Sequence, residues 1–314
     1  MASTNKIAII GAGSVGATIA YNLSIRGTAN TIVLVDIDKT KAEAERMDIQ
    51  QGNPLGRAVR VVAADYDACQ DADVAVITAG AKQRPGESRV DLLARNASIA
   101  RSMAASLRDS GFSGILFVVT NPVDVLTTII REETGFEASR VIGSGTVLDT
   151  ARLREFLAGY CDVSPINVHA YVLGEHGETS FPAWSLTRVG GLRADEFARF
   201  RGRDPEADDL FSVAAKSVRD SAGAIIAAKG STFYAVAQAV AVMVEAVLRN
   251  ENRILPVSVV DTYEGVSDVS FSYPTVVGAA GAVQRLPVVL SDDEKSALRR
   301  SVEFIAQNTK DARR

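Results

Sequence analysis

A histidine in a glycine-flanked turn is a candidate for proton transfer near neutral pH. The 314-residue sequence has two histidines, and one of them, His176, stands in the segment Gly-Glu-His-Gly at 174–177. Asp149 and Arg152 lie upstream, three residues apart. A carboxylate can orient an imidazole for acid–base work, and the arginine fork can hold an anionic substrate beside it. The three side chains could therefore protonate a small anionic substrate.

An expected helix at 147–159 would place Asp149 and Arg152 on one face, because residues three apart are neighbours on a helix. The simpler interpretation is a surface ion pair, which is common and contributes little stability. Arg154 lies about 200° around the helix from Arg152. We therefore expect Arg154 to have a different partner or none.

A glycine-rich turn joins the first expected strand, at 7–10, to a helix that reaches about residue 27. Its residues predict a dinucleotide site: Gly11, Gly13, Ser14, Val15 and Gly16. In this context Gly11 permits the tight turn, Gly13 the approach of a pyrophosphate, and Gly16 close packing of helix on strand. The helix N-terminus then presents N–H groups and a positive dipole end to the phosphates.

Asp36 ends the second expected strand, 20 residues after Gly16. An acid at this point can accept hydrogen bonds from ribose hydroxyls and repel the extra phosphate of NADP, so we expect NAD as the cofactor. The alternative, a plain turn and a solvated aspartate, is disfavoured by context and spacing together. We assign the end of the fourth strand to the same site, namely Thr78, Ala79 and Gly80.

Two further segments follow strands of the expected sheet. A loop containing Pro and Gly at 80–87 leaves the fourth strand, and Gln83 and Arg89 are candidates to reach over a bound substrate as a mobile lid. The default for such a segment is a solvated surface loop. Asn121 and Pro122 follow the fifth strand, where Asn caps a helix with Pro in its first turn, or the Asn121 amide faces cofactor or substrate. The residues alone leave these alternatives open.

The alternation of strands and helices up to about residue 144 predicts an α/β fold with a doubly wound parallel sheet. We expect a Rossmann-type NAD-binding domain at 1–144 and a mixed α+β substrate domain at 145–314. The expected elements of the second half are strands near 166–173, 184–189, 254–262 and 269–277, and helices near 147–159, 206–228, 231–249 and from 292.

Composition excludes several function classes. A net charge of −4 argues against nonspecific binding of nucleic acid. The most apolar stretch, 233–248, contains Gln238 and Glu245 and is too short and polar to span a bilayer. Cys69 and Cys161 are isolated, without metal-ligand spacing or a disulfide framework, and no secretion signal begins the chain. We expect a cytoplasmic protein without a metal site.

Over essentially its whole length the sequence resembles the lactate/malate dehydrogenase family, and its bacterial L-lactate dehydrogenase branch in particular. The resemblance rests on the glycine-rich turn, the lid, 120–124 (Thr-Asn-Pro-Val-Asp), 149–152 (Asp-Thr-Ala-Arg), 174–177 and 229–232 (Lys-Gly-Ser-Thr), in this order. It implies that NADH reduces pyruvate to L-lactate in a homotetramer, with His176 as proton donor and acceptor held by Asp149. It further implies that Arg152 grips the substrate carboxylate, that Arg89 polarises the ketone, and that Asn121 and Thr232 line the site.

Gln83 favours lactate over malate chemistry within this resemblance. The malate enzymes have an arginine at this lid position, which pairs with a second carboxylate, whereas glutamine leaves that carboxylate poorly compensated. Lys82 and Arg84 could still reach inward in a different loop register. The alternatives are therefore a malate or broader 2-hydroxyacid dehydrogenase, and, in another class, a dinucleotide-binding scaffold without turnover.

His169, the second histidine, has an ordinary interpretation as a strand residue satisfied in the core or at an interface. His169 and Arg154 also match positions at which many bacterial relatives bind fructose 1,6-bisphosphate between subunits. The resemblance therefore implies, as a hypothesis, that this bisphosphate activates the enzyme by stabilising the tetramer.

Overall fold

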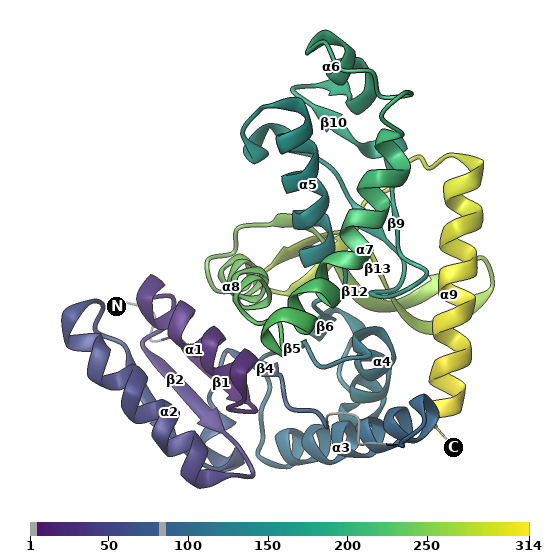
Figure 1. The fold of residues 1–314 in the computed structure, drawn as a ribbon. Helices are drawn as coiled ribbons and strands as arrows, with labels where there is room; N and C mark the ends of the chain where they lie inside the picture. Colours follow the sequence, from purple (N-terminus) through teal and green to yellow (C-terminus); the bar gives the residue numbers. More distant parts are fainter. Residues whose placement is uncertain (1–4, 82–85, 314) are drawn as a thin grey trace.

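A parallel sheet forms the centre of the computed structural model, which describes residues 5–81 and 86–313 (Figure 1). Its strands are β1 (Lys6–Ile10), β2 (Thr31–Val35), β3 (Arg60–Ala63), β4 (Val74–Ile77), β5 (Ile115–Val118) and β6 (Val141–Gly143). They are ordered β3-β2-β1-β4-β5-β6. The order in which successive strands are added reverses between β1 and β4. In open α/β sheets this is the point at which the ligand crevice lies, at the carboxyl ends of the strands. The predicted fold class is confirmed.

Helices cover both faces of this sheet, because after their first residue the strands are apolar at successive rather than alternate positions. The helices of this half are α1 (Ser14–Arg26), α2 (Lys39–Gly52), α3 (Arg89–Asp109) and α4 (Val123–Thr134). Ile7 and Ile9 of β1 pack in one core with Ile19 and Leu23 of α1. Ala8 and Ile10 point the other way, into a second core that contains residues of α3 and α4.

The sheet continues beyond the expected domain boundary, although its parallel strands end there with β6. An antiparallel extension follows β6 and consists of β12 (Arg253–Tyr263), β13 (Val266–Gly278) and β14 (Gly281–Arg285). Ser258 of β12 pairs with Gly143 of β6, so the two halves share one nine-stranded sheet. The extension joins both cores, since Val257 packs in the first and Phe271 in the second.

The remaining elements form a lobe and two long helices. They are α5 (Val147–Cys161), β7 (Val168–His169), β8 (Val172–Leu173), β9 (Phe181–Pro182), β10 (Arg188–Val189), β11 (Leu192–Arg193), α6 (Ala194–Phe200), α7 (Leu210–Lys229), α8 (Tyr234–Leu248) and α9 (Asp292–Ala312). Short 3₁₀ helices occupy Asn53–Leu55, Tyr66–Cys69, Ala138–Arg140, Pro165–Asn167 and Trp184–Leu186. A third core, which includes Leu153, Leu157 and Val168, holds the lobe together.

Two expectations for the second half were wrong in detail. The strand expected at 166–173 is two short strands, β7 and β8, preceded by a 3₁₀ turn that begins at Pro165. The strand expected at 184–189 begins as a 3₁₀ helix, and only Arg188 and Val189 form a strand. In both cases a proline or a bulky aromatic residue begins a tight turn within an apolar run.

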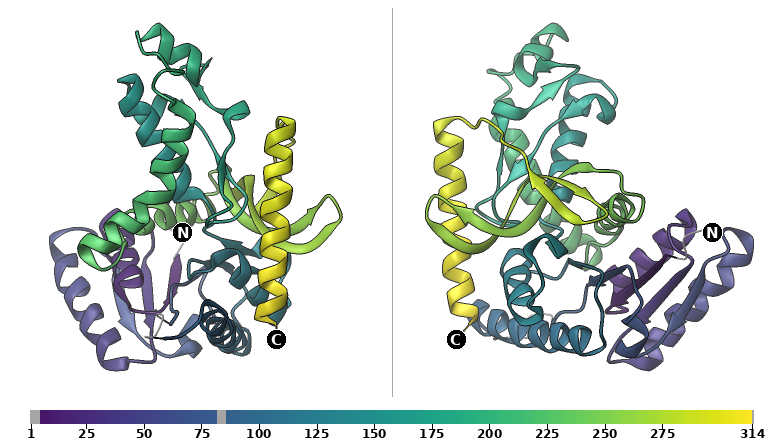
Figure 2. Two further views of the ribbon diagram at one scale, coloured as in Figure 1. Left: turned by 45° about the vertical axis from the view of Figure 1, so that its right-hand side comes forward. Right: turned by 180° about the vertical axis from the view of Figure 1, so that it is seen from behind.

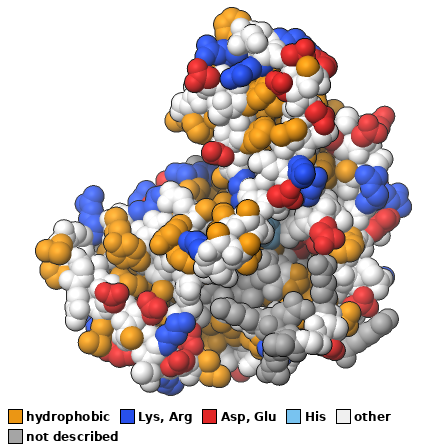
Figure 3. Space-filling model, in the orientation of Figure 1, with side chains coloured by type: hydrophobic (Ala, Val, Ile, Leu, Met, Phe, Trp, Pro, Cys, Tyr) orange, Lys and Arg blue, Asp and Glu red, His pale blue; other side chains and the backbone are white. Residues whose placement is uncertain are grey.

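The two halves meet at an angle, with the lobe of α5, α6 and α7 above the body that contains α1 and α2 (Figures 1 and 2). The space-filling view shows an open notch between the lobe and this body (Figure 3). Helix α9 runs along the outer edge of the molecule and ends beside α3 (Figure 2). No helix in the described ranges is long and apolar enough to cross a membrane.

Candidate active site

The glycine-rich turn has the shape that a pyrophosphate needs. Gly11 has a φ of +109°, and a Cβ there would lie 2.6 Å from the backbone N of Ala79. A Cβ on Gly16 would lie 1.8 Å from the carbonyl oxygen of Gly11. Gly13, in contrast, has no atom within 4 Å of the corresponding position, which leaves open space at the N-terminus of α1. Packing thus requires glycine at positions 11 and 16, whereas Gly13 leaves free space that can hold a dinucleotide phosphate.

Asp36 follows β2 directly and contacts the glycine-rich turn. Its Oδ2 accepts a hydrogen bond from the backbone N–H of Ala12 at 2.6 Å, and its Oδ1 accepts one from Asp38 at 2.9 Å. The carboxylate also lines a cavity of about 230 Å³ beside Lys39 and Ala63. Asp36 therefore connects the turn to the place where the resemblance puts a ribose.

The end of β4 forms a wall of the same crevice. The hydroxyl of Thr78 donates to the carbonyl of Gly11 at 2.8 Å, and that of Thr120 donates to the carbonyl of Ala79 at 2.8 Å. A Cβ on Gly80 would lie 2.4 Å from the methyl group of Thr120. The predicted cofactor residues at 78–80 are thus held against β1 and β5 at the carboxyl edge of the sheet.

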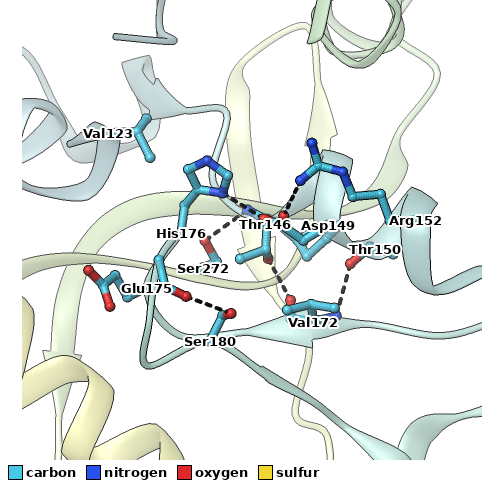
Figure 4. Close-up of polar contacts among 12 residues, drawn as sticks. Val123, Thr146, Asp149, Thr150, Arg152, Val172, Glu175, His176, Ser180 and Ser272 are labelled. Atoms are coloured by element: carbon cyan, nitrogen blue, oxygen red, sulfur yellow. Dashed lines mark hydrogen bonds and ion pairs between the residues drawn. The ribbon is translucent and has the colours of Figure 1, made fainter. Parts of the chain in front are cut away.

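Asp149 brings His176 and Arg152 together (Figure 4). Its Oδ2 lies 2.6 Å from Nδ1 of His176, and its Oδ1 accepts a hydrogen bond from a guanidinium N–H of Arg152 at 2.9 Å. Asp149 stands in the first turn of α5, where the helix dipole favours an anion. With side chains only 7% and 14% exposed, Asp149 and Arg152 are not the solvated surface pair of the simpler interpretation.

This contact sets the charge of both partners. Burial lowers the pKa of His176, but the charge and hydrogen bond of Asp149, together with the charge of Asp124, raise it by more, so that the pKa lies above its usual value. Burial likewise raises the pKa of Asp149, yet His176 and Arg152 hold it below its usual value. The pair therefore favours a carboxylate beside an imidazolium, and Nε2 of the ring is left to act on a substrate.

Asp124 is a buried residue at this site that the sequence analysis did not identify. Its Oδ2 accepts the backbone N–H of His176 at 2.7 Å, and its Oδ1 accepts the hydroxyl of Ser258. Burial raises the pKa of Asp124 to about 6, although both hydrogen bonds favour the ionised form. The side chain is 2% exposed. An acid among the apolar residues of the first turn of α4 was the available signal, because buried acids need partners.

A cavity of about 500 Å³ lies beside His176, Arg152 and Asp149. Helix α7 provides its opposite wall with Val218, Arg219, Asp220 and Ala222, none of which the sequence analysis named. Val218 and Ala222 are four residues apart, so that both point from one face of the helix. Among the described residues, no cluster of His, Cys, Asp or Glu could hold a metal ion.

Other predicted residues lie farther from this cavity. Asn121 is exposed, and its side chain accepts the backbone N–H of Val123 at 3.3 Å. The capping alternative placed Pro122 in the first turn of the helix, whereas the structure has Pro122 as the cap of α4. Thr232 lies between α7 and α8, outside the residues that line the cavity. Arg154 contacts the carbonyl of Pro165.

The lid is described only in part. Gln83, with Lys82 and Arg84, lies outside the described residues. Arg89, which follows the expected loop at 80–87, is the first residue of α3, and the hydroxyl of Ser88 caps the helix by accepting the N–H of Asp91 at 3.1 Å. The Arg89 side chain also lies outside the described part of the structure.

Family models match almost the whole chain. The lactate/malate dehydrogenase NAD-binding domain matches residues 5–143, and the α/β C-terminal domain of the same family matches residues 146–314. The chain belongs to the lactate/malate dehydrogenase family. The predicted family and the NAD cofactor are thereby confirmed.

Individual relatives agree with this assignment. The chain is 46% identical over 302 residues to an L-lactate dehydrogenase of Thermoanaerobacter sp., covering 96% of this chain and 97% of the relative. It is 41% identical over 307 residues to an L-lactate dehydrogenase of Priestia megaterium, covering 97% and 95%. A solved lactate dehydrogenase from a deep-sea metagenome superimposes with a TM-score of 0.94 at 40% identity, covering 99% of each chain. The ligand-bound minor L-lactate dehydrogenase of Enterococcus mundtii gives 0.93 at 38% identity, covering 98% of each. These likenesses support an NAD-dependent L-lactate dehydrogenase, as the sequence resemblance implied.

Proposed function

We propose that this protein interconverts pyruvate and L-lactate with NAD, using His176 as both acid and base. The observation that carries the proposal is the shared carboxylate of Asp149, which holds the imidazole of His176 and the guanidinium of Arg152 beside one cavity. A small keto acid has two features to match, a carbonyl that needs a proton and a carboxylate that needs a cation. The relatives named L-lactate dehydrogenase support this choice of substrate.

His176 supplies the proton. When bound against the glycine-rich turn and Asp36, NADH supplies a hydride to the keto carbon of pyruvate. His176 donates its Nε2 proton to the carbonyl oxygen, while Asp149 stabilises the imidazolium before the transfer and fixes the ring through Nδ1. In the reverse direction, neutral His176 accepts the proton of the lactate hydroxyl.

Arginines position and polarise the substrate in this scheme. A guanidinium has five N–H donors. One bond from Arg152 to Asp149 therefore leaves donors for a two-pronged pair with the substrate carboxylate. By the family resemblance, Arg89 approaches the carbonyl oxygen as the lid closes, and Asn121 and Thr232 complete the pocket. Closure of the lid excludes water, which strengthens each of these contacts.

Gln83 restricts the pocket to substrates with one carboxylate, as the sequence comparison within the family suggests. Steady-state oxidation of NADH with pyruvate and with oxaloacetate tests this point directly. We expect the larger specificity constant with pyruvate, and a Gln83→Arg variant should shift the ratio toward oxaloacetate by roughly a thousandfold. A wild-type preference for oxaloacetate would show that the proposed substrate is wrong.

The acid–base role has its own test. His176→Asn should lower kcat for pyruvate by at least about a hundredfold, because general acid catalysis is lost while the folded cavity remains. His169→Asn is the matched control, since His169 lies on β7 in the lobe and does not line the cavity. Binding of NADH without any keto-acid-dependent oxidation by the wild type would instead favour a cofactor-binding protein without turnover.

We further propose a cytoplasmic homotetramer that fructose 1,6-bisphosphate activates. The buried, unpaired Cys69 and Cys161 suit a reducing compartment. Arg154 and the exposed His169 come from neighbouring segments of the lobe, since Arg154 contacts Pro165 in the 3₁₀ turn that leads into β7. Arg188 pairs with His169 across the β7–β10 ladder and adds a third basic side chain.

A further inference from the structure

The C-terminal helix α9 reaches into the loop that carries His176. Ser301 of α9 is completely buried, and its hydroxyl oxygen accepts the backbone N–H of Glu175 at 2.7 Å. Glu175 directly precedes His176, so this bond fixes the Gly174–Glu175 peptide, one peptide before the one that joins Glu175 to His176. Ser301 is 126 residues away from Glu175 in sequence, which is why no local pattern indicates the contact.

Thr179 completes a closed ring of hydrogen bonds with these two residues. The Thr179 hydroxyl lies 2.6 Å from Oε2 of Glu175 and 2.9 Å from the hydroxyl of Ser301. A carboxylate can only accept, so Thr179 donates to Glu175, and Ser301 must donate to Thr179. The backbone N–H of Thr179 also donates to Oε2 of Glu175, at 3.1 Å. The ring therefore runs from the Glu175 backbone through both hydroxyls back to the Glu175 carboxylate.

The two glycines around the histidine make room for this ring. A Cβ on Gly174, whose φ is +88°, would lie 2.4 Å from the hydroxyl oxygen of Ser301. A Cβ on Gly177 would lie 2.5 Å from Oε1 of Glu175. The Glu175 side chain points away from the imidazole (Figure 4), so it serves the loop and not the substrate. The Gly-Glu-His-Gly segment is thus shaped by Ser301 as well as by the cavity.

We propose that Ser301 is a positioning residue for His176, acting from the C-terminal helix through the N–H of Glu175. The proposal rests on the proposed acid–base role of His176. The loop has two other backbone anchors, the pairing of Gly174 with Ser272 and the bond from His176 N–H to Asp124. Ser301 is the anchor between them. A shift of about 1 Å at a reacting group can cost a hundredfold in rate, so a third anchor matters for catalysis.

The charged groups around the imidazole of His176 make its position measurable through its pKa. Within residues 5–81 and 86–313, apart from the Arg89 side chain, the charged groups that face His176 or line its cavity are Asp149 and Arg152 of α5, Asp124 of α4, Arg219 and Asp220 of α7, and Glu178. Of these, Asp149 holds the imidazole directly and opposes the effect of burial on its pKa. An imidazole that moves away from Asp149 loses the interaction that raises its pKa. Its pKa then falls, which a purely structural weakening elsewhere in α9 would not cause.

Ser301→Ala tests the proposal, with Ser296→Ala as the matched control. Ser296 lies on the same helix, is exposed, and donates its hydroxyl only to Asp292 one turn earlier. We expect Ser301→Ala to lower kcat for pyruvate about tenfold while KM changes less than about twofold, as for an interaction that matters in the transition state. The pH midpoint of kcat/KM should move down by about half a unit. Ser296→Ala should match the wild type in all three.

A measurement independent of turnover uses the low histidine content. With only two histidines, labelled imidazole resonances of His169 and His176 can be assigned from a His169→Gln variant and titrated by NMR. The titration of His176 should move to lower pH in Ser301→Ala, and that of His169 should stay. Wild-type kcat together with an unmoved His176 titration would overturn the proposal. Failure of the wild type to reduce pyruvate would overturn the proposed function instead, and the titration would still decide the role of Ser301.

Thr179 provides a second route if Ser301→Ala does not fold. Thr179→Val keeps the shape of the side chain but removes the hydroxyl that bonds to Ser301 and to the Glu175 carboxylate. We therefore expect the same downward shift of the His176 titration. Thr179→Ser retains the hydroxyl and should restore wild-type behaviour. Equal titrations for Thr179→Val and Thr179→Ser would contradict a positioning role for the ring.

Discussion

The carboxylate of Asp149, in the first turn of α5, lies 2.6 Å from Nδ1 of His176, which belongs to a loop 27 residues later. The contact makes the imidazole a stronger base than burial alone would allow, since burial lowers its pKa whereas Asp149, with a smaller contribution from Asp124, raises it above the usual value. The protonated ring therefore persists to higher pH. Pyruvate reduction, which uses the imidazolium, should decline as pH rises through the raised pKa, and lactate oxidation should rise over the same range.

The first prediction removes the charge of Asp149. Asp149→Asn should lower kcat/KM for pyruvate at neutral pH by about a hundredfold or more, because the imidazolium loses its counter-charge and the ring its orientation. The midpoint of the pH profile should move to lower pH. Asp48→Asn, at an exposed position on α2, is the control. An unmoved midpoint in Asp149→Asn would mean that another group sets the pKa of His176.

The second prediction concerns Asp124, which joins three segments at one carboxylate. Asp124→Ala leaves the His176 N–H without its acceptor and leaves the buried Ser258 hydroxyl with the Ser270 hydroxyl as its remaining partner. The expected loss is about 3 kcal/mol in the free energy of unfolding, measured by urea denaturation at fixed protein concentration. Asp124→Asn keeps an acceptor for the N–H and should lose less. The exposed Asp48→Ala variant should change stability by less than about 0.5 kcal/mol. If Asp124→Ala also lost less than about 0.5 kcal/mol, the buried contacts of Asp124 would not be needed for stability.

Sequence patterns were sufficient for the first half of the fold because its strands and turns are local. Continuous apolar runs such as 7–10 are buried on both faces of the sheet, and the glycine-rich turn follows with Gly11 at positive φ. The joining of β12 to β6 could not be predicted in this way. It depends on Ser258 meeting Gly143, two residues whose local sequence carries no information about each other.

The residues of the candidate site likewise fall into those that local sequence could identify and those that it could not. Asp149, Arg152 and His176 could be named because their chemistry is unusual at those spacings, and the structure brings them together. Asp124 and Ser301 act from α4 and α9 through backbone groups of the histidine loop. A hydroxyl or carboxylate that binds a distant N–H has no sequence signature of its own. Such supporting residues become visible only when the tertiary contacts are known.

The third prediction addresses the choice of cofactor. Asp36 accepts the N–H of Ala12, and in the proposed cofactor site a 2′-phosphate would bring a second negative charge close to its carboxylate. Asp36→Asn removes the repulsion and weakens the support of the turn. We expect the preference for NADH over NADPH, measured as the ratio of the two specificity constants, to fall at least about tenfold. Asp48→Asn, at an exposed position on α2 outside the cavity that Asp36 lines, should leave the ratio unchanged. An unchanged ratio in Asp36→Asn would place the discrimination elsewhere.

The last prediction tests the bisphosphate hypothesis on the lobe. Arg154 and His169 belong to segments in contact, and neither lines the cavity beside His176, so changes there should leave the chemistry intact. Added fructose 1,6-bisphosphate should lower the apparent KM for pyruvate of the wild type at subsaturating substrate. Arg154→Ala and His169→Ala should each weaken this response about tenfold or more, because each removes a charge or donor from a phosphate. Their kcat at saturating pyruvate should remain close to that of the wild type. Sedimentation with and without the bisphosphate would report the coupled change in assembly, since a ligand that binds the tetramer preferentially must favour it. A flat response of the wild type, in both KM and sedimentation, would contradict the hypothesis.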